Sequence, residues 1–260
     1  MLVSPERNNY TEADMFSSEA THLAMELGCG LAAGGLAVGG FFYASLWPTS
    51  RIFGSALIAP RTPGELALTF DDGPNPVWTP RLLETLAKHD VKATFFMMGQ
   101  HAAWEPALAR EVHAAGHRVG LHSFSHPNLS RSSKKVIREE LVRNRETLEE
   151  ILGSPVRFFR PPFGARRPAV FTIARELGLT TTLWNAMTSD WSDRDPALIA
   201  RKLTAKVEGL TRKGFAANVV LHDGGHLDVR VDRGPSVAAA GLLMEKFKPT
   251  HRFVTLDAWA

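Results

Sequence analysis

The sequence predicts an α/β fold in which about seven parallel strands form a barrel or near-barrel. Of the 260 residues, 44% are apolar, enough to bury the core of one sizeable domain. From residue 63 onward, seven short apolar runs alternate with longer amphipathic stretches. Strands that alternate with helices form parallel sheets, and seven of them favour a barrel over a small open sheet.

The seven apolar runs have the length of strands. In chain order they are LALTF (66–70), ATFFMMG (93–99), HRVGLHS (117–123), VRFF (156–159), TTTLW (180–184), NVVLHD (218–223) and RFVTL (252–256). The stretches between them, such as 79–90 and 105–116, mix apolar and charged residues as surface helices do. The longest helix is predicted to start at Ser132 or Ser133 and to end at Gly153, before Pro155.

Residues 27–47 are predicted to form an N-terminal hydrophobic helix that lies in a membrane. No charged residue interrupts these 21 positions, about the length that spans a bilayer. Aromatic residues gather at the end of the segment, as they do at a membrane interface. A buried helix or an uncleaved signal segment would give the same pattern. The chain thus divides into a tail (1–26), a transmembrane or signal-anchor segment (27–47), a linker (48–62) and a globular domain (63–260).

Composition excludes several classes of protein. The net charge is +3, a mild basic bias that is compatible with an anionic polymer or surface as neighbour. Basic residues do not cluster with interleaved aromatic residues, so we expect no nucleic-acid partner. Cys29 is the only cysteine, which excludes an internal disulfide and a cysteine-rich metal site. Nothing in the sequence indicates an obligate protein partner.

Polar side chains follow five of the predicted strands. In α/β barrels, functional groups lie at the carboxyl ends of the strands. Each group taken alone is typical of a turn or a solvated loop. Their shared position at strand ends predicts that they converge on one mouth. In chain order the groups are Asp71 with Asp72, His122 with His126, Arg160, Asp190 with Trp191, and His222 with Asp223.

These residue types fit a mononuclear metal hydrolase. Two imidazoles and one carboxylate are a common ligand set for a catalytic divalent ion. Such an ion lowers the pKa of a bound water and polarises a carbonyl group. A further carboxylate can take a proton from the water, and a histidine on the opposite side can protonate a leaving amine. Adjacent Asp71 and Asp72 would allow one carboxylate to bind the metal while the other acts as base.

The same residues resemble the polysaccharide deacetylase family, which has a NodB-homology domain and includes carbohydrate esterases. The motifs TFDDGP, HSFSH, RPPF, DW and LHD match the five motifs of the family in order, and the resemblance covers residues 63–260. It implies a distorted (β/α) barrel. It also implies removal of N-acetyl groups from an N-acetylated glycan such as a chitooligosaccharide, peptidoglycan or an exported polysaccharide.

The resemblance also implies a role for ten residues, motif by motif. The implied catalytic residues are Asp71 as general base, His222 as general acid, Arg160, which orients Asp71, and Asp190, which tunes His222. The implied metal ligands are Asp72, His122 and His126, for one divalent ion that is usually zinc. The implied substrate-binding residues are Phe163, Trp191 and Val220. The chain departs from the family at Met187, where members often have an acidic residue, and mildly at Val220, where they often have leucine.

Two other functions agree with the sequence. One is hydrolysis of a lipid-linked sugar or a small amide by the same residues, which a basic domain next to a membrane would suit. The other is a non-catalytic glycan-binding relative, although such a relative would be expected to lose a ligand, the base or the acid. The substrate class implies that the catalytic domain lies outside the cytoplasm, in the periplasm or at the cell surface, with residues 27–47 as its membrane anchor.

Overall fold

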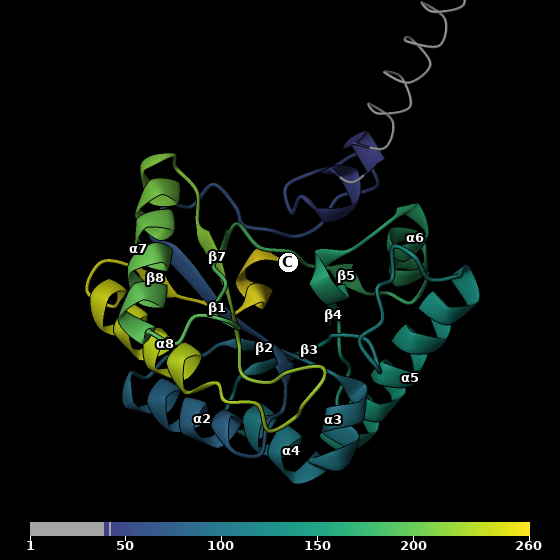
Figure 1. The fold of residues 1–260 in the computed structure, drawn as a ribbon, viewed down its shortest axis with the longest axis horizontal. Coiled ribbons are helices and arrows are strands. Elements are labelled where there is room, and N and C mark those ends of the chain that lie inside the picture. Colours follow the sequence, from purple (N-terminus) through teal and green to yellow (C-terminus); the bar gives the residue numbers. More distant parts are fainter. Residues whose placement is uncertain (1–38, 42) are drawn as a thin grey trace, which may run out of the picture. The chain divides into compact units, whose positions relative to one another are not determined.

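The structure is a computed structural model that describes residues 39–41 and 43–260. Residues Ala44–Ala260 form one compact unit, which contains the fold (Figure 1). The tail 1–26 and most of the predicted membrane segment 27–47 lie outside the described residues, so the anchor stays a prediction. Within the described part of the chain, no helix is long and apolar enough to cross a membrane.

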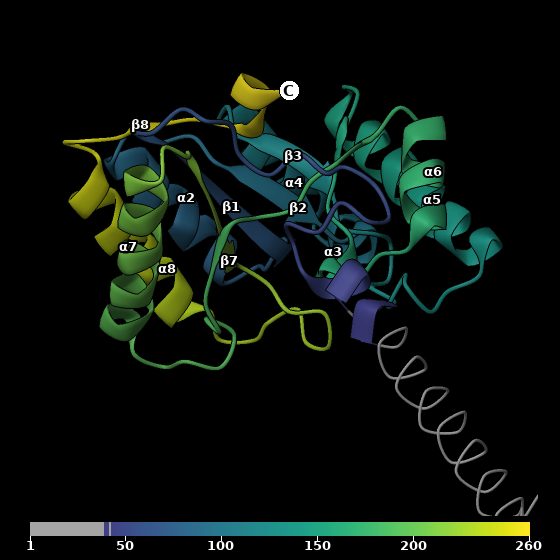
Figure 2. The same ribbon diagram turned by 90° about the horizontal axis from the view of Figure 1, so that it is seen from above.

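One parallel sheet lies at the centre of this unit (Figures 1 and 2). Its strands are β1 (Glu65–Gly73), β2 (Thr94–Met97), β3 (Arg118–Leu121), β4 (Phe158–Phe159), β5 (Thr180–Thr181), β6 (Ala186–Met187), β7 (Ala217–His222) and β8 (Arg252–Phe253). Seven strands follow the order β5-β4-β3-β2-β1-β7-β6, and β8 pairs with the start of β1. The α/β fold of about seven parallel strands is therefore confirmed.

Helices cover the outer side of the sheet (Figure 1). They are α2 (Trp78–Lys88), α3 (Gly99–Trp104), α4 (Pro106–Ala114), α5 (Lys134–Leu152), α6 (Pro168–Glu176), α7 (Pro196–Arg212) and α8 (Gly234–Phe247). Successive contacts run α7-α8-α2-α4-α5-α6, so these helices form an outer layer that curves around the strands. The strands bury both faces, which explains why they read as short, continuous apolar runs.

The sheet does not close into a complete barrel. Among the described residues, no strand pairing joins β5 to β6, so the architecture is a half-barrel. The chain before β1 lies along this opening, where Leu57 forms an isolated parallel bridge with Thr182 of the segment after β5. On the other side, Asn218 Nδ2 of β7 donates to the carbonyl of Ile58 over 2.9 Å. Residues assigned to the linker from the sequence thus connect the two sides of the opening.

Local signals at the element ends explain several boundaries. Helix α5 begins after Ser133, whose side chain accepts a hydrogen bond from Val136 N, and it ends at Gly153 in the left-handed conformation. This confirms the predicted start and end of the longest helix. The sequence prediction missed β6, and it extended the strand of 180–184 beyond Thr181, where β5 ends. Two-residue strands are too short for hydrophobic periodicity to show their limits.

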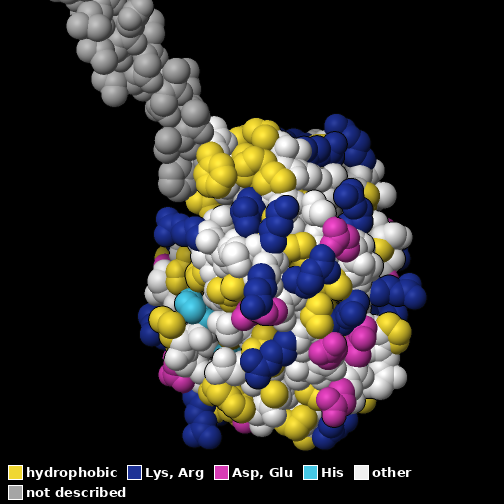
Figure 3. All heavy atoms as spheres, turned by 90° about the vertical axis from the view of Figure 1, so that its right-hand side faces the viewer, with side chains coloured by type: hydrophobic (Ala, Val, Ile, Leu, Met, Phe, Trp, Pro, Cys, Tyr) yellow, Lys and Arg dark blue, Asp and Glu magenta, His cyan; other side chains and the backbone are white. Residues whose placement is uncertain are grey.

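The surface carries charge of both signs. On the face in Figure 3, lysine and arginine side chains are spread among acidic and apolar ones, in agreement with the small net charge of +3. Exposed apolar side chains include Leu46, Trp47 and Ile52 in the first part of the compact unit.

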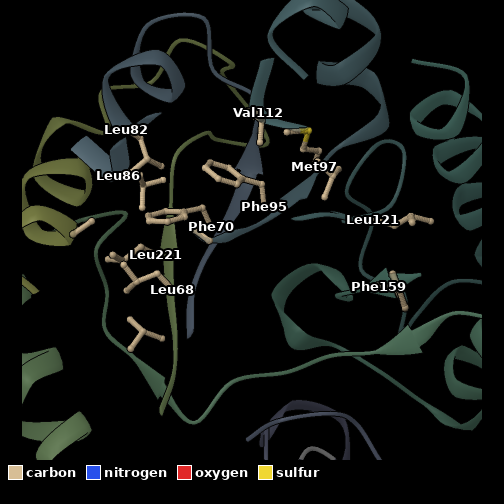
Figure 4. Close-up of a cluster of buried hydrophobic side chains, with 14 of the residues drawn as sticks. Leu68, Phe70, Leu82, Leu86, Phe95, Met97, Val112, Leu121, Phe159 and Leu221 are labelled. Atoms are coloured by element: carbon tan, nitrogen blue, oxygen red, sulfur yellow. The ribbon is translucent and has the colours of Figure 1, made fainter. Parts of the chain in front are cut away.

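The main core lies between the sheet and the helices (Figure 4). Phe70 of β1 and Phe95 of β2 are almost fully buried, and their rings pack with centroids 5.3 Å apart. Phe95 also packs against the ring of His117 at 5.4 Å. These contacts join neighbouring strands below the carboxyl ends, where the functional side chains lie.

We predict that Phe95→Ala lowers the free energy of unfolding by about 3–5 kcal/mol, because it leaves a cavity in a close-packed core. Urea denaturation monitored by circular dichroism measures this change. The control is Leu242→Ala on α8, whose side chain is 40% exposed and should cost much less. Equal losses for the two variants would contradict the assignment of Phe95 to the core.

Candidate metal and catalytic site

A cavity of about 520 Å³ opens at the carboxyl ends of the strands. Eight of the ten site residues predicted from the sequence line it. The other two, Arg160 and Asp190, are hydrogen-bonded to the lining residues Asp71 and His222. The predicted convergence of strand ends on one mouth is therefore seen in the structure. The eight are Asp71, Asp72, His122, His126, Phe163, Trp191, Val220 and His222.

A bulge at the end of β1 explains how two adjacent carboxylates reach one cavity. Successive side chains of a regular strand point to opposite faces of the sheet. Here the register between β1 and β2 shifts between Asp71 and Gly73, and Asp72 has φ 70°. This left-handed conformation is unusual for a residue other than glycine. The bulge turns Asp72 toward the cavity that Asp71 already faces.

Asp72, His122 and His126 form a buried cluster of metal-ligand type. Their potential ligand atoms lie within 4.8 Å of one another. The Nε2 atoms of His122 and His126 lie 3.3 and 3.2 Å from Asp72 Oδ1. His122 Nδ1 lies 2.8 Å from the carbonyl oxygen of Arg160 and therefore carries the proton, which leaves Nε2 with a free lone pair.

This donor set fits a divalent metal ion. Asp72 Oδ1 is buried and has no hydrogen-bond partner in the protein. Buried polar atoms are nearly always satisfied, so an orphaned carboxylate oxygen facing two imidazole nitrogens is what a cation site requires. The group could bind a metal such as zinc, which takes nitrogen and oxygen ligands in this combination.

The electrostatics of the cluster favour the deprotonated ligands. Burial raises the pKa of Asp72, but the imidazoles beside it, His122 first, outweigh burial and hold that pKa well below its usual range. Burial lowers the pKa of His126, although Asp72 opposes this effect. A carboxylate and a neutral imidazole are the forms that bind a metal.

A buried arginine holds Asp71. Arg160 Nη1 donates to Asp71 Oδ1 over 2.7 Å and to Thr69 Oγ1 over 2.8 Å. Arg160 is fully buried, and its guanidinium carbon lies 4.1 Å from the centroid of the Phe96 ring. Since Asp71 Oδ1 is occupied, Oδ2 is the oxygen left to face the cluster, where it lies 3.9 Å from His122 Nε2.

His222 is held by a carboxylate on its far side. Asp190 Oδ1 lies 2.9 Å from His222 Nδ1, and Asp190 Oδ2 accepts from the backbone N–H of His222 and from Ser236 Oγ, each over 2.8 Å. Burial lowers the pKa of His222, but the charge and hydrogen bond of Asp190 exceed this effect and raise the pKa to about 9. With Nδ1 bonded to Asp190, Nε2 is the ring nitrogen left for the cavity.

Apolar and aromatic side chains form the remaining wall. Phe163 and Trp191 are about half exposed at the mouth, at 51% and 47%, whereas Val220 is buried beneath them. The ring of Trp191 meets the ring of His222 edge to face at 5.4 Å. Trp184 and Met187 also line the cavity, although the sequence predicted a role for neither.

Three polar side chains of the cavity lining were not predicted from the sequence, those of His226, Asp228 and Arg233. His226 lies nearest to the predicted ligands. It lies on the loop after β7, and its ring stacks on that of His126 with centroids 4.4 Å apart. The signal in the sequence was a histidine four residues after His222, but it has no place in the five motifs.

Asp223 was predicted from the sequence to lie at a strand end. Its burial raises its pKa to about 7, and Thr79 Oγ1 donates to it over 2.5 Å.

Comparisons with known proteins agree with this site. Residues 59–182 match the family described as polysaccharide deacetylase. The chain is 34% identical over 206 residues to a peptidoglycan-N-acetylglucosamine deacetylase of Bacillus cereus, covering 78% of this chain and 70% of that protein. It is 39% identical over 158 residues to a chitooligosaccharide deacetylase of Sinorhizobium fredii, covering 60% of this chain and 71% of that protein.

A solved structure supports the fold. The crystal structure of a Bacillus anthracis protein described as a CE4 family pseudoenzyme matches with a TM-score of 0.70 and 26% identity, covering 78% of this chain and 68% of that chain. Likeness of fold by itself therefore does not distinguish an active relative from an inactive one, and the residues of the site must do so.

We predict that the imidazole of His222 titrates near pH 9 in the metal-free protein, well above its ordinary value of 6.5. Asp190→Asn should lower this pKa, because it removes the charge that favours the imidazolium. Because the pKa of His222 is higher in the folded state than in the unfolded state, the His222–Asp190 pair stabilises the folded protein. This stabilisation is complete below about pH 6.5 and is lost as the pH rises through about 9.

Histidine NMR titration measures the pKa in each variant. The control is Asp193→Asn, which removes a nearby carboxylate that pairs with Lys202 instead. A titration of His222 near pH 6.5 in the unaltered protein would show that Asp190 does not control it.

Proposed function

Because this chain belongs to the polysaccharide deacetylase family, we propose that it removes N-acetyl groups from an N-acetylated glycan with the residues of this cavity. Proteins of this family are hydrolases that act on carbon–nitrogen bonds other than peptide bonds, and this chain is such a hydrolase. We assign Asp72, His122 and His126 as ligands of one divalent metal ion, most simply zinc. Asp71 is the general base and His222 the general acid.

One observation supports this assignment above the others. Two separately anchored proton-transfer groups line the same cavity as the ligand cluster, and each has one atom left free to act. Asp71 keeps Oδ2 because Arg160 holds Oδ1, and His222 keeps Nε2 because Asp190 holds Nδ1. Cleavage of an amide needs a base for the water and an acid for the amine.

The metal would supply electrostatic chemistry at this point. When bound, a divalent ion lowers the pKa of water and polarises the carbonyl of an acetamide. The protein residues do the proton transfers. Asp71 Oδ2 accepts the proton of the attacking water, and the Asp71–Arg160 ion pair keeps the carboxylate oriented for this step.

His222 completes the cleavage from the neighbouring strand β7. Without a proton the nitrogen would have to leave as an amide anion, which is a very poor leaving group. The imidazolium of His222 therefore gives its Nε2 proton to the departing nitrogen, which leaves as a neutral amine. Asp190 stabilises that imidazolium and keeps the ring turned toward the cavity. The half-exposed Trp191 and the buried Val220 offer an apolar surface for the acetyl methyl group, and Phe163 lines the mouth with its ring against His126.

The substrate we propose is an N-acetylglucosamine residue of peptidoglycan or of a chitooligosaccharide. Both names come from relatives of this chain. The mild basic bias of the sequence suits an anionic cell-wall polymer better than a neutral one. Acetate release from a panel of peptidoglycan, chitooligosaccharides and other acetylated glycans tests the choice, and no release from any of them would refute the proposed function.

A second candidate is a deacylase that acts on a lipid-linked sugar or a small amide. The cavity supports this candidate, because its volume of about 520 Å³ leaves apolar space near the catalytic pair. The apolar wall contains Trp184, Met187 and Val220. Rates measured with acetyl, propionyl and butyryl amides of one glucosamine substrate decide between the two. Faster release of the longer acyl groups would favour the second candidate.

We propose that the enzyme acts outside the cytoplasm, since the relatives act on cell-wall polymer by name. The predicted anchor at 27–47 would hold it at the membrane. Fractionation of cells that produce the full chain tests the anchor, and release of all the protein into the soluble fraction would contradict it.

We predict that Asp71→Asn and His222→Ala each lower the turnover rate by about 100-fold or more, the usual effect of a lost proton-transfer group. Each variant should keep its metal, since neither residue is assigned as a ligand. Acetate release and metal analysis on the same samples measure both effects. The matched controls are Asp90→Asn and His89→Ala, which lie in the turn after α2 and should be fully active. Near-normal turnover of His222→Ala would place the acid elsewhere.

We predict that dialysis against a chelator abolishes acetate release and that added zinc restores it. His126→Ala should bind zinc much more weakly, because it removes one of three ligands. Binding should also weaken as the pH falls, since the ligands must be deprotonated. Elemental analysis after gel filtration measures the bound metal, and an undiminished, tightly held ion in His126→Ala would refute the ligand set.

A further inference from the structure

A third imidazole, that of His226, lies at the metal cluster and has no role in the proposed reaction. It lines the cavity, and its side chain is 34% exposed. His226 Nδ1 lies 3.9 Å from Asp72 Oδ2. The other oxygen of the same carboxylate, Oδ1, is the one that faces His122 and His126. The two oxygens of Asp72 therefore have different imidazole neighbours.

The ring of His226 is parallel to a ligand ring. His126 and His226 stack with centroids 4.4 Å apart and an angle of 20° between their planes. Each ring has a nitrogen near one oxygen of Asp72, with His126 Nε2 at 3.2 Å from Oδ1. Phe163 meets both rings edge to face, at 4.6 Å from His126 and 5.5 Å from His226. This packing limits the positions that the His226 ring can occupy.

The backbone before His226 is held against Asp72. A side chain at Gly224 would place its Cβ 2.0 Å from the carbonyl oxygen of Asp72, so the two backbones are in direct contact and only glycine fits. Arg233 Nε donates to the carbonyl of Gly224 over 2.5 Å, and Arg233 Nη1 donates to the carbonyl of Trp191 over 3.3 Å. The loop therefore presents His226 at a defined place beside the carboxylate.

We propose that His226 is a positioning residue of the metal site. Its Nδ1–H serves as hydrogen-bond donor to Asp72 Oδ2, which keeps Oδ1 as the single oxygen turned toward His122 and His126. The inference rests on the metal role assigned to these three residues under the proposed function. The 3.9 Å separation is about 1 Å longer than a hydrogen bond, and a small rotation of the partly exposed ring closes it.

The geometry points to an action through Asp72 and not to a fourth ligand. In the part of the chain that the structure describes, the group whose ligand atoms all lie within 4.8 Å of one another contains Asp72, His122 and His126, and His226 is not a member. Partners that hydrogen-bond to a ligating carboxylate orient it, and their loss typically weakens metal binding 10- to 100-fold.

Zinc affinity tests the inference without any substrate. Competition with a chromophoric chelator gives the dissociation constant of zinc for the full chain and three variants. His226→Ala should raise this constant by about 10- to 100-fold. His226→Asn should keep it close to the original value, because the amide nitrogen of asparagine can occupy the place of Nδ1 and donate to Oδ2. Arg230→Ala, an exposed residue of the same loop outside the cavity lining, is the control and should bind zinc normally.

A second readout separates positioning from direct ligation. Cobalt bound in place of zinc has an absorption spectrum that reports the atoms coordinating it. We expect His226→Asn to leave this spectrum unchanged. The inference is overturned if His226→Ala binds zinc as tightly as the unaltered protein. It is also overturned if His226→Asn binds as weakly as His226→Ala and changes the cobalt spectrum, since His226 would then itself be a ligand. Because no glycan is present, these outcomes do not depend on whether the deacetylase assignment holds.

Discussion

The site depends on one constraint of strand geometry. Adjacent residues of a β-strand point to opposite faces, yet this cavity needs the carboxylates of Asp71 and Asp72 on the same side. The bulge at the end of β1 resolves the conflict, with Asp72 in a left-handed conformation. Tertiary contacts compensate for this unfavourable backbone. His101 Nδ1 donates to the Asp72 carbonyl over 3.0 Å, and Met98 N donates to the carbonyl of Gly73 over 3.0 Å.

Strain and buried charge are concentrated at the same place. Of the five non-glycine residues with positive φ in the described chain, four lie at the site, and they are Asp72, Ser123, His126 and Phe163. Two ion pairs are buried at the site, Arg160 with Asp71 and Asp190 with His222. Removal of one member of a buried pair typically costs about 3–5 kcal/mol, so the catalytic groups and their partners also stabilise one another. Burying such an ion pair costs desolvation free energy. The cost is tolerated here because each pair orients a catalytic side chain.

Much of the fold could be predicted from the sequence because its signals are local. Each of the seven apolar runs overlaps a strand, and Ser133 and Gly153 delimit α5 as predicted. The rest depends on contacts between distant parts of the chain. Strand β6 has two residues and exists because Ala186 and Met187 pair with β7. Residues near Leu57 were assigned to a linker, since no local pattern shows that they bridge the opening of the half-barrel.

The sequence by itself determined which chemical groups are available and at which strand ends they stand. Residue identity and hydrophobic pattern are properties of short segments, so the motifs could be read directly. Only the tertiary structure decided which atoms meet. Asp71 and His222 lie side by side because β1 and β7 pair in parallel register. The bulge decides which oxygen of Asp72 faces the two ligand imidazoles. The loop packed against the bulge places a third imidazole beside the other oxygen. No local pattern contains such information, because these distances arise between segments about 50 to 150 residues apart.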